Sequence, residues 1–115
     1  CSAFREYNNT QKNYLVENSK HYIREHIHER IVLLEIADTF GVSANYLSQL
    51  FKKYEGIGIS EYVTQQKIQL SKELLKEGKM KIYEIADLLG FESAFYFSKV
   101  FKKVTGLSPK DYRNQ

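Results

Sequence analysis

The sequence predicts an all-α fold of about seven helices, and three observations lead to this prediction. Hydrophobic residues make up 43% of the 115 residues, enough to form a core. A single proline and six glycines favour long uninterrupted elements, and no dipeptide typical of a β-hairpin occurs. A segment of about 30 residues also occurs twice, each time with apolar residues at helical spacing.

The repeat relates residues 33–62, LLEIADTFGVSANYLSQLFKKYEGIGISEY, to residues 82–112, IYEIADLLGFESAFYFSKVFKKVTGLSPKDY. Both copies contain EIAD, then a glycine, and later a tyrosine, a serine and FKK. Glycine just beyond a helix is a typical stop signal because it tolerates positive φ. Each copy therefore predicts a short helix, a turn at the glycine and a second helix that ends in paired lysines.

The helices can be followed along the chain from its start. Residues 1–12 are polar without a period, and we interpret them as a linker. From Tyr14 to about Glu29, apolar residues near helical spacing predict an amphipathic helix. Leu33–Phe40 is expected to form a short helix, which Gly41 ends. The predicted inward side chains of this short helix are Leu34, Ile36, Ala37 and Phe40.

The next two helices each have a start signal and a stop signal. Ser43 is a good N-cap for a helix over Ala44–Glu55, and Gly56 ends it. Ser60 can cap a longer helix over about Glu61–Glu77. The predicted inward faces are Leu47, Leu50 and Phe51 in the first of these helices, and Tyr62, Val63, Ile68, Leu74 and Leu75 in the second.

The same pattern then restarts, with helices expected over Ile82–Leu89 and about Ser93–Val104 on either side of Gly90. Gly106 ends the second of them, and Ser108-Pro109 opens a last short helix, since proline suits the first helical turn. We therefore expect two subdomains joined by a long helix. The predicted boundaries are 1–12 for the linker, 13–115 for the domain, about 13–58 for the first lobe, about 60–77 for the connecting helix and about 79–115 for the second lobe.

Two short helices packed across a glycine turn have the form of a helix-turn-helix, whose second helix enters the DNA major groove. Outward side chains of that helix are candidates for reading base edges. Asn and Gln can bind adenine, Lys can donate to guanine, and an aromatic ring can pack on the methyl group of thymine. The predicted base-reading residues are Asn45, Ser48 and Gln49 in the first copy, and Ala94, Phe95, Tyr96 and Lys99 in the second.

Phosphate contacts are expected later in the same helices, where lysines add affinity without reading sequence. These residues are Lys52, Lys53, Lys102 and Lys103. Backbone N–H groups at the helix starts, such as the start capped by Ser43, are also suited to phosphate. A connecting helix of roughly 17 residues spans about 25 Å, and successive major-groove faces lie roughly 34 Å apart. One chain is therefore expected to contact two successive major grooves, at an asymmetric site because the two outward faces differ.

Composition fits this interpretation and excludes several others. The net charge of +3 and the pI of about 8.9 permit a polyanionic partner. Cys1 is the only cysteine, so no internal disulfide or thiolate metal cluster can form, and we expect no metal and no cofactor. No long apolar run or signal peptide is present, so a cytoplasmic location is expected. The start without Met suggests a missing N-terminal domain, with processing as the alternative.

These residues also carry a family resemblance. The stretch from Leu33 to Arg113, about 80 residues, closely resembles the DNA-binding domain of AraC/XylS-type bacterial transcription regulators, most of all that of YesN-type response regulators. The motifs are YLSQLFKK (46–53), KIYEIADLLGF (81–91), YFSKVFKK (96–103) and GLSPKDYR (106–113). The resemblance implies two helix-turn-helix lobes, the same base-reading positions, promoter binding and contact with RNA polymerase. It also implies a separate N-terminal sensor or receiver domain; the fragment alone is expected to be monomeric.

The chain departs from the family in its connecting helix. The family usually has arginine and an apolar residue where this chain has Lys67-Ile68, and alanine where Ser71 stands. The resemblance implies a phosphate or bracing role for Lys67, which keeps the charge but lacks the guanidinium fork. The second recognition helix has few hydrogen-bonding side chains. We therefore expect the first lobe to dominate base discrimination and the second to read methyl groups and DNA shape.

Several residues have a purely structural interpretation. The lysine pairs could be solvated helix ends that complement the helix dipole, and Phe95 could fold into the core. His21, His26 and His28 have spacings of five and two, whereas zinc on a helix needs four. No arrangement of nucleophile and base suggests an enzyme. Two alternatives in function remain, a helical protein-interaction module without DNA binding and an architectural DNA binder without sequence preference.

Overall fold

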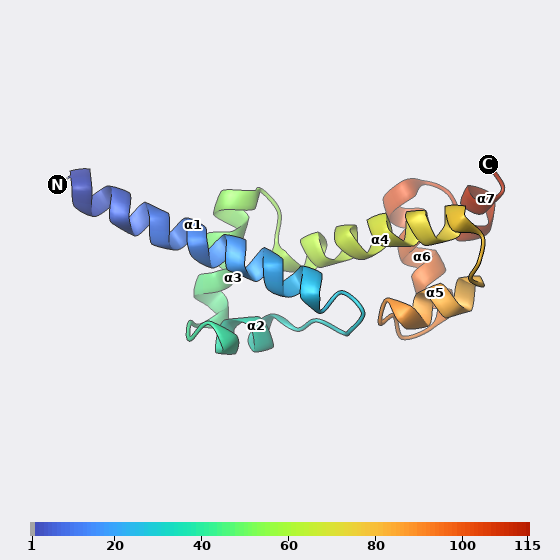
Figure 1. Ribbon diagram of the computed structural model, residues 1–115, viewed down its shortest axis with the longest axis horizontal. Coiled ribbons are helices and arrows are strands. Elements are labelled where there is room, and N and C mark those ends of the chain that lie inside the picture. Colours follow the sequence, from blue (N-terminus) through green and yellow to red (C-terminus); the bar gives the residue numbers. More distant parts are fainter. Residues whose placement is uncertain (1) are drawn as a thin grey trace. The chain divides into compact units, whose positions relative to one another are not determined.

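A computed structural model describes the backbone of residues 2–115 and the side chains from residue 12 onward. Within this range the chain forms seven helices and no strand, which confirms the all-α prediction (Figure 1). None of these helices combines the length and apolar character needed to cross a membrane. In chain order they are α1 (Ser2–Glu25), α2 (Leu33–Thr39), α3 (Ala44–Glu55), α4 (Ile59–Glu77), α5 (Ile82–Leu88), α6 (Ala94–Thr105) and α7 (Pro109–Arg113).

The chain divides into two compact units. Unit 1 comprises Cys1–His26 and Ile31–Tyr62, and unit 2 comprises Ile27–Arg30 and Val63–Gln115. The long helix α4 therefore begins in unit 1 and continues into unit 2. A short segment that follows α1 also belongs to unit 2, although it lies far from the rest of that unit in sequence.

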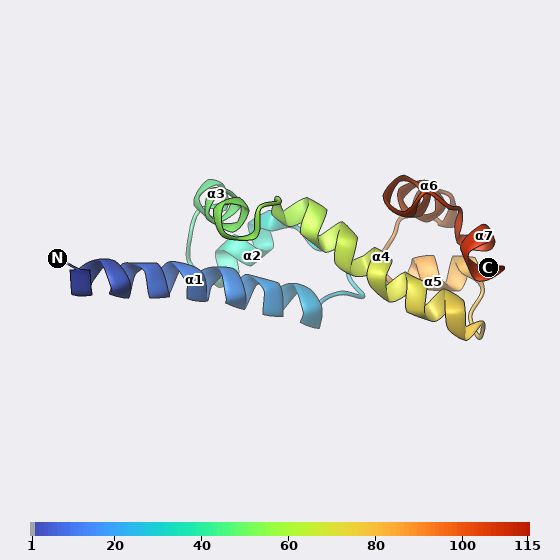
Figure 2. The ribbon, with the colours of Figure 1, turned by 90° about the horizontal axis from the view of Figure 1, so that it is seen from above.

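In unit 1, helices α2 and α3 lie along one side of α1 (Figure 2). An ion pair joins α1 to α3, with the Lys20 ammonium 2.6 Å from a carboxylate oxygen of Glu55. Hydrogen bonding to this carboxylate raises the pKa of Lys20 above its ordinary value. The buried core of the unit draws on all its helices and includes Val16, Ile23, Ile36, Ala37, Leu47, Leu50, Phe51 and Ile59.

In unit 2, α5 and α6 pack with the later turns of α4 around a second core, which α7 helps to close. The guanidinium of Arg113 on α7 donates to the backbone carbonyls of Leu75, at 3.2 Å, and Met80. These bonds fix the last helix against the end of α4. The buried residues of this core are Ile68, Leu75, Ile85, Ala86, Leu89, Phe97 and Phe101.

The first helix differs from the sequence prediction at both ends. It begins at Ser2, so the segment 1–12 predicted as a linker is helical from its second residue onward. Lack of an apolar period does not prevent helix formation, and no glycine or proline interrupts the chain before Gly41. The helix ends at Glu25, earlier than the predicted Glu29, and the backbone carbonyls of Ile27 and Glu29 accept hydrogen bonds from Lys67.

Two smaller predictions were also wrong. Leu34 was expected to face the core but is 62% exposed, because α2 has only seven residues and buries just Ile36 and Ala37. Ser60 was expected to cap the connecting helix, but the helix already begins at Ile59. The other helix boundaries agree with the sequence prediction to within one residue at each end.

Candidate nucleic-acid interface

Each unit contains one helix pair, α2–α3 in unit 1 and α5–α6 in unit 2, and both pairs are joined by the same turn. Gly41 has a φ of 68° and Gly90 a φ of 76°, in the left-handed region that glycine adopts readily. In the first turn the N–H of Val42 donates to the carbonyl of Ala37 at 3.0 Å. The second turn repeats this bond, from Phe91 to Ala86, at 3.0 Å.

The second helix of each pair also starts in the same way. The Ser43 hydroxyl accepts a hydrogen bond from the N–H of Tyr46 at 3.1 Å, and the Ser93 hydroxyl accepts one from Tyr96 at 3.0 Å. Both helices have 12 residues and end at a left-handed glycine. Each residue of α3 therefore has a counterpart fifty positions later in α6 (44 to 94, 55 to 105).

The inward faces of the paired helices hold them in place. Leu47 and Phe51 of α3 are fully buried, as are their counterparts Phe97 and Phe101 of α6. The ring of Phe51 meets Tyr62 edge-on at 5.3 Å between centroids, and the ring of Phe101 meets Tyr112 in the same way at 5.5 Å. Because the inward faces are anchored alike, the outward faces project from equivalent positions.

The outward faces carry most of the residues predicted to read bases. Asn45 and Gln49 are exposed and lie one turn apart on α3, and Phe95 and Lys99 occupy the same positions on α6. Phe95 is 81% exposed, so the alternative that it folds into the core is wrong. Tyr96 is also exposed, whereas Ser48 and Ala94 are half-buried at the margins of these faces.

The lysine pairs continue the same faces toward the helix ends. Lys52 and Lys53 in α3 and Lys102 and Lys103 in α6 are all exposed. In each helix the residues at i, i+4 and i+7 share one side, so a lysine follows the two predicted base-reading positions. A polar or aromatic start and a cationic end on one face fit base contact near the helix start and phosphate contact near its end.

Lys67 was predicted to contact phosphate, and this prediction was wrong. Its side chain is buried, and its ammonium donates to the carbonyl oxygens of Ile27 at 2.9 Å, Glu29 at 2.7 Å and Leu89. Burial lowers the pKa of Lys67 from 10.5 to about 8, against an opposing effect of the Glu29 carboxylate. Lys67 thus braces unit 2 from within.

The sequence reasoning missed the segment that Lys67 binds. Ile27–Arg30 packs so closely on the second turn that a Cβ built on Gly90 would lie 2.8 Å from the backbone carbonyl carbon of Glu29. The segment has no period of its own, so no sequence signal marks it. Lys67 offered one hint, because it stands in the apolar stripe of α4, four residues after the buried Val63.

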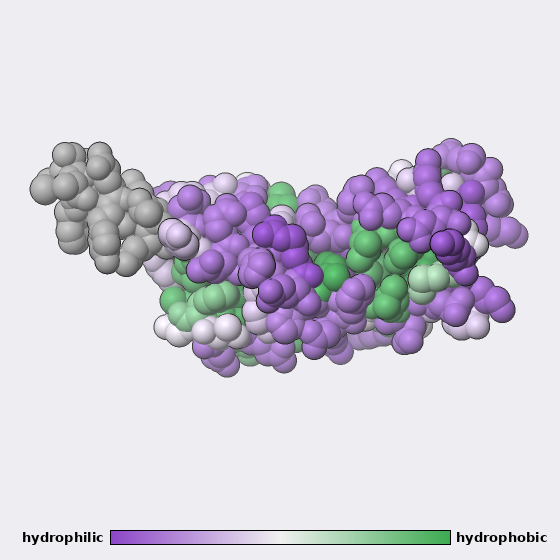
Figure 3. Space-filling view, in the orientation of Figure 1, coloured by the Kyte–Doolittle hydropathy of each residue, from purple (hydrophilic) through white to green (hydrophobic). Residues whose placement is uncertain are grey.

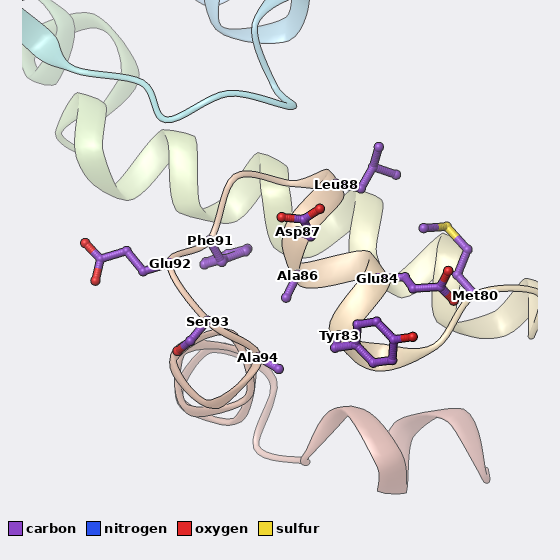
Figure 4. A pocket seen from close by; sticks show the side chains of 10 residues that line it. All are labelled: Met80, Tyr83, Glu84, Ala86, Asp87, Leu88, Phe91, Glu92, Ser93 and Ala94. Carbon is purple, nitrogen blue, oxygen red and sulfur yellow. The ribbon is translucent and has the colours of Figure 1, made fainter.

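A pocket lies between α5 and the start of α6 (Figure 4). Its lining includes the acidic residues Glu84, Asp87 and Glu92, and Figure 4 shows the Glu92 side chain pointing away from the other labelled side chains. On the face of unit 2 turned to the viewer in Figure 3, hydrophobic side chains are bordered by hydrophilic ones. Glu92 also pairs with Arg30 at 3.6 Å between their charged groups, and the pocket lining includes Ser93 and Ala94 at the start of α6. The exposed lysines lie later in the same helix. The lysine-bearing side is the candidate interface.

Comparison with known proteins agrees with this geometry. A family model described as a helix-turn-helix domain matches residues 36–115, which include both turns and both second helices. The chain is 38% identical over 101 residues to the uncharacterized HTH-type transcriptional regulator YijO of Escherichia coli, a match that covers 88% of the chain and 36% of that relative. The chain therefore spans about a third of the length of this relative.

Two solved structures have the same fold. The C-terminal domain of the two-component response regulator yesN from Fusobacterium nucleatum matches with a TM-score of 0.81 and 36% identity, over 84% of this chain and 95% of that one. A transcriptional regulator from Chromobacterium violaceum, described among AraC-type DNA-binding domain-containing proteins, matches with a TM-score of 0.83 and 25% identity. That match covers 92% of this chain and 95% of the other.

Proposed function

Because the chain belongs to the AraC-type family of helix-turn-helix transcription regulators, we propose that it binds a specific double-stranded DNA sequence and regulates transcription. The family is a class of regulators, not of enzymes. The observation that carries the proposal is the pair of matched helices α3 and α6, each capped by serine and each with an exposed face that ends in lysines. We assign α3 and α6 to the major groove at two successive helical turns of one duplex.

The base-reading roles in unit 1 follow from side-chain chemistry. Asn45 and Gln49 each offer a donor and an acceptor, the pattern that adenine presents in the major groove. Ser48 stands between them at the margin and can donate or accept. In unit 2 the same face offers Phe95, Tyr96 and Lys99 beside Ala94, of which Lys99 can donate to guanine.

The phosphate contacts are assigned to exposed cations and to helix starts. Lys52, Lys53, Lys102 and Lys103 would each neutralise a phosphate. The backbone N–H groups at the start of α3 are a further candidate, with Ser43 as the cap. Lys67 is left out of this set because it is buried.

Binding measured at several salt concentrations tests the proposal. Duplexes should first be selected from a random DNA pool, and they should share one asymmetric sequence. About six phosphate contacts would give a slope near −5 for log K against log salt. Binding without sequence preference would point to an architectural DNA binder. No binding at any salt concentration would favour the protein-interaction module, for which the 81% exposed Phe95 is the supporting observation.

The remaining partners are proposed for the intact protein. We assign it a promoter as target, contact with RNA polymerase and a cytoplasmic location, as expected for a bacterial regulator of this family. Since the chain spans 36% of the relative YijO, a sensor or receiver domain is proposed to precede it in the whole protein. The fragment itself is expected to be a monomer, because its two helix pairs already supply the two contacts that many regulators obtain by dimerisation.

A further inference from the structure

The first turns of the two recognition helices differ at one exposed position on the same scaffold. Ser43 and Ser93 make the same cap, Ala44 matches Ala94 and Tyr46 matches Tyr96. Between them, Asn45 in unit 1 is replaced by Phe95 in unit 2. Any difference in what the two first turns recognise must therefore come mainly from this one position.

Phe95 is well placed to contact a ligand. It is the most exposed of the large hydrophobic side chains among the described residues, at 81%, and it makes no aromatic contact that would hold it back on the protein. The neighbouring Tyr96 ring, in contrast, rests near Phe91 at 6.3 Å between centroids. At this exposure nearly the whole ring is available for contact with a partner that covers it.

The charges around Phe95 indicate a nucleic acid as that partner. Lys99 and Lys102 follow it at i+4 and i+7, so both lie on its side of α6. The acidic residue nearest in sequence, Glu92, is paired with Arg30 at 3.6 Å. A duplex drawn to the lysines would bring its major groove against Phe95.

Within a major groove, an apolar side chain finds one favourable partner on the base edges, the C5-methyl group of thymine. We propose that unit 2 reads the C5-methyl group of a pyrimidine through Phe95. This inference rests on the proposed DNA binding. It makes Phe95 a specificity-determining residue, whereas its counterpart Asn45 reads hydrogen-bonding groups.

The chemistry of phenylalanine extends this inference to methylated cytosine. Thymine presents an acceptor at C4 and cytosine presents a donor, but Phe95 has no polar atom with which to distinguish them. 5-Methylcytosine carries the same methyl group as thymine at the same place. Unit 2 is therefore expected to accept 5-methylcytosine where it accepts thymine and to bind less well to unmethylated cytosine or to uracil.

The test uses the duplex selected by the chain itself. Each thymine of that duplex is replaced in turn by uracil, which removes only the methyl group, and the dissociation constant is measured. At the position facing Phe95, uracil should weaken binding about fourfold, as expected for one methyl-sized group worth about 0.8 kcal/mol. At the same position, 5-methylcytosine should bind more tightly than cytosine by a similar factor.

Single substitutions test whether Phe95 causes the difference in binding between thymine and uracil duplexes. Phe95→Ala should bind thymine and uracil duplexes equally at that position, Phe95→Leu should keep part of the difference, and Asn45→Ala should keep all of it. Thermal unfolding of Phe95→Ala should match that of the parent chain, because the side chain is 81% exposed.

The two levels of the proposal can fail separately. If no duplex binds at any salt concentration, the proposed DNA binding is wrong. If a specific duplex binds but no thymine responds to loss of its methyl group, only the methyl recognition is wrong. If a thymine responds equally in the parent chain and in Phe95→Ala, the methyl group is read by another residue and the assignment to Phe95 is overturned.

Discussion

Gly41 and Gly90 occupy the same place in the two turns and have nearly the same backbone conformation, but their surroundings differ. A Cβ on Gly41 would meet no heavy atom within 4 Å, whereas one on Gly90 would lie 2.8 Å from the Glu29 carbonyl carbon and 2.9 Å from its oxygen. Gly41 is thus required only for its positive φ. Gly90 is required both for its φ and for the close approach of another backbone.

This pair allows the two requirements to be separated. Gly41→Ala should lower the free energy of unfolding by about 1 kcal/mol, the cost of a left-handed alanine. Gly90→Ala adds a steric clash with backbone that cannot turn away, and its loss should be larger, about 3 kcal/mol. Chemical denaturation of both variants measures this difference. Equal losses would mean that the segment around Glu29 moves aside at little cost.

For single residues, the sequence predicted burial and exposure where the residues follow helical spacing within the repeat, and it missed contacts made by a segment outside the repeat. The buried Ile36 and Ala37 follow from helical spacing, and so does the exposure of Asn45. The position of Lys67 in the apolar stripe of α4 hinted at its burial, but its partners could not be predicted, because two of them are backbone carbonyls of a segment without any pattern. The two glycines look identical in sequence, and only the fold distinguishes them.

Among the helices, α4 carries two buried polar residues, Lys67 and Ser71, on its inward face. Its Lys67 carries three hydrogen bonds to carbonyl oxygens, one on the turn after α5 and two on the segment after α1. Four residues later the hydroxyl of the buried Ser71 donates to the carbonyl of Ile68 at 2.6 Å. A single cation thus binds together three parts of unit 2 that are distant in sequence, which a helical wheel of α4 alone would not reveal.

Stability at alkaline pH should report on Lys67. Folded Lys67 has a pKa of about 8 and the unfolded chain a value near 10.5, so between these pH values only the unfolded state holds the proton. The free energy of unfolding should therefore rise through this window relative to that of Lys67→Met, which has no titrating group. Denaturant unfolding of both chains from pH 7.5 to about 10.5 measures the difference and cancels the titration of the tyrosines.

A constant difference across that window would contradict this expectation. It would show that the three carbonyl oxygens hold the proton on Lys67 in the folded state as firmly as water does in the unfolded one. At neutral pH, Lys67→Met should be less stable than the parent chain in either case, because it leaves these carbonyls without their donor.

For the molecule as a whole, the net charge of +3 is small, but the positive charges are unevenly distributed along the chain. Two lysine pairs end the two recognition helices, while carboxylates stand at the pocket beside α5. The composition therefore permits a polyanionic partner, and the lysine-bearing faces of α3 and α6 are the surfaces proposed to bind it. Sequence alone predicted both lysine pairs because each copy of the repeat contains FKK.

Removal of each lysine pair tests whether both units bind one duplex. The variants Lys52→Ala/Lys53→Ala and Lys102→Ala/Lys103→Ala should each make the salt slope shallower by about 1.8, and their combination by about twice that. Lys79→Ala, an exposed lysine outside both helices, is the matched control and should leave the slope unchanged. If one pair has no effect on the slope, its unit does not contact phosphate on the selected duplex.

The membership of residues 27–30 in unit 2 bears on how this domain could be divided. A fragment that starts at Val63 would contain α5, α6 and α7 but would lose two of the three acceptors of Lys67 and the backbone that covers Gly90. We therefore expect such a fragment to be less stable than the whole domain, because it lacks the tetrapeptide between α1 and α2. Swapping halves between relatives to exchange their DNA preferences would have to carry that tetrapeptide along with the graft.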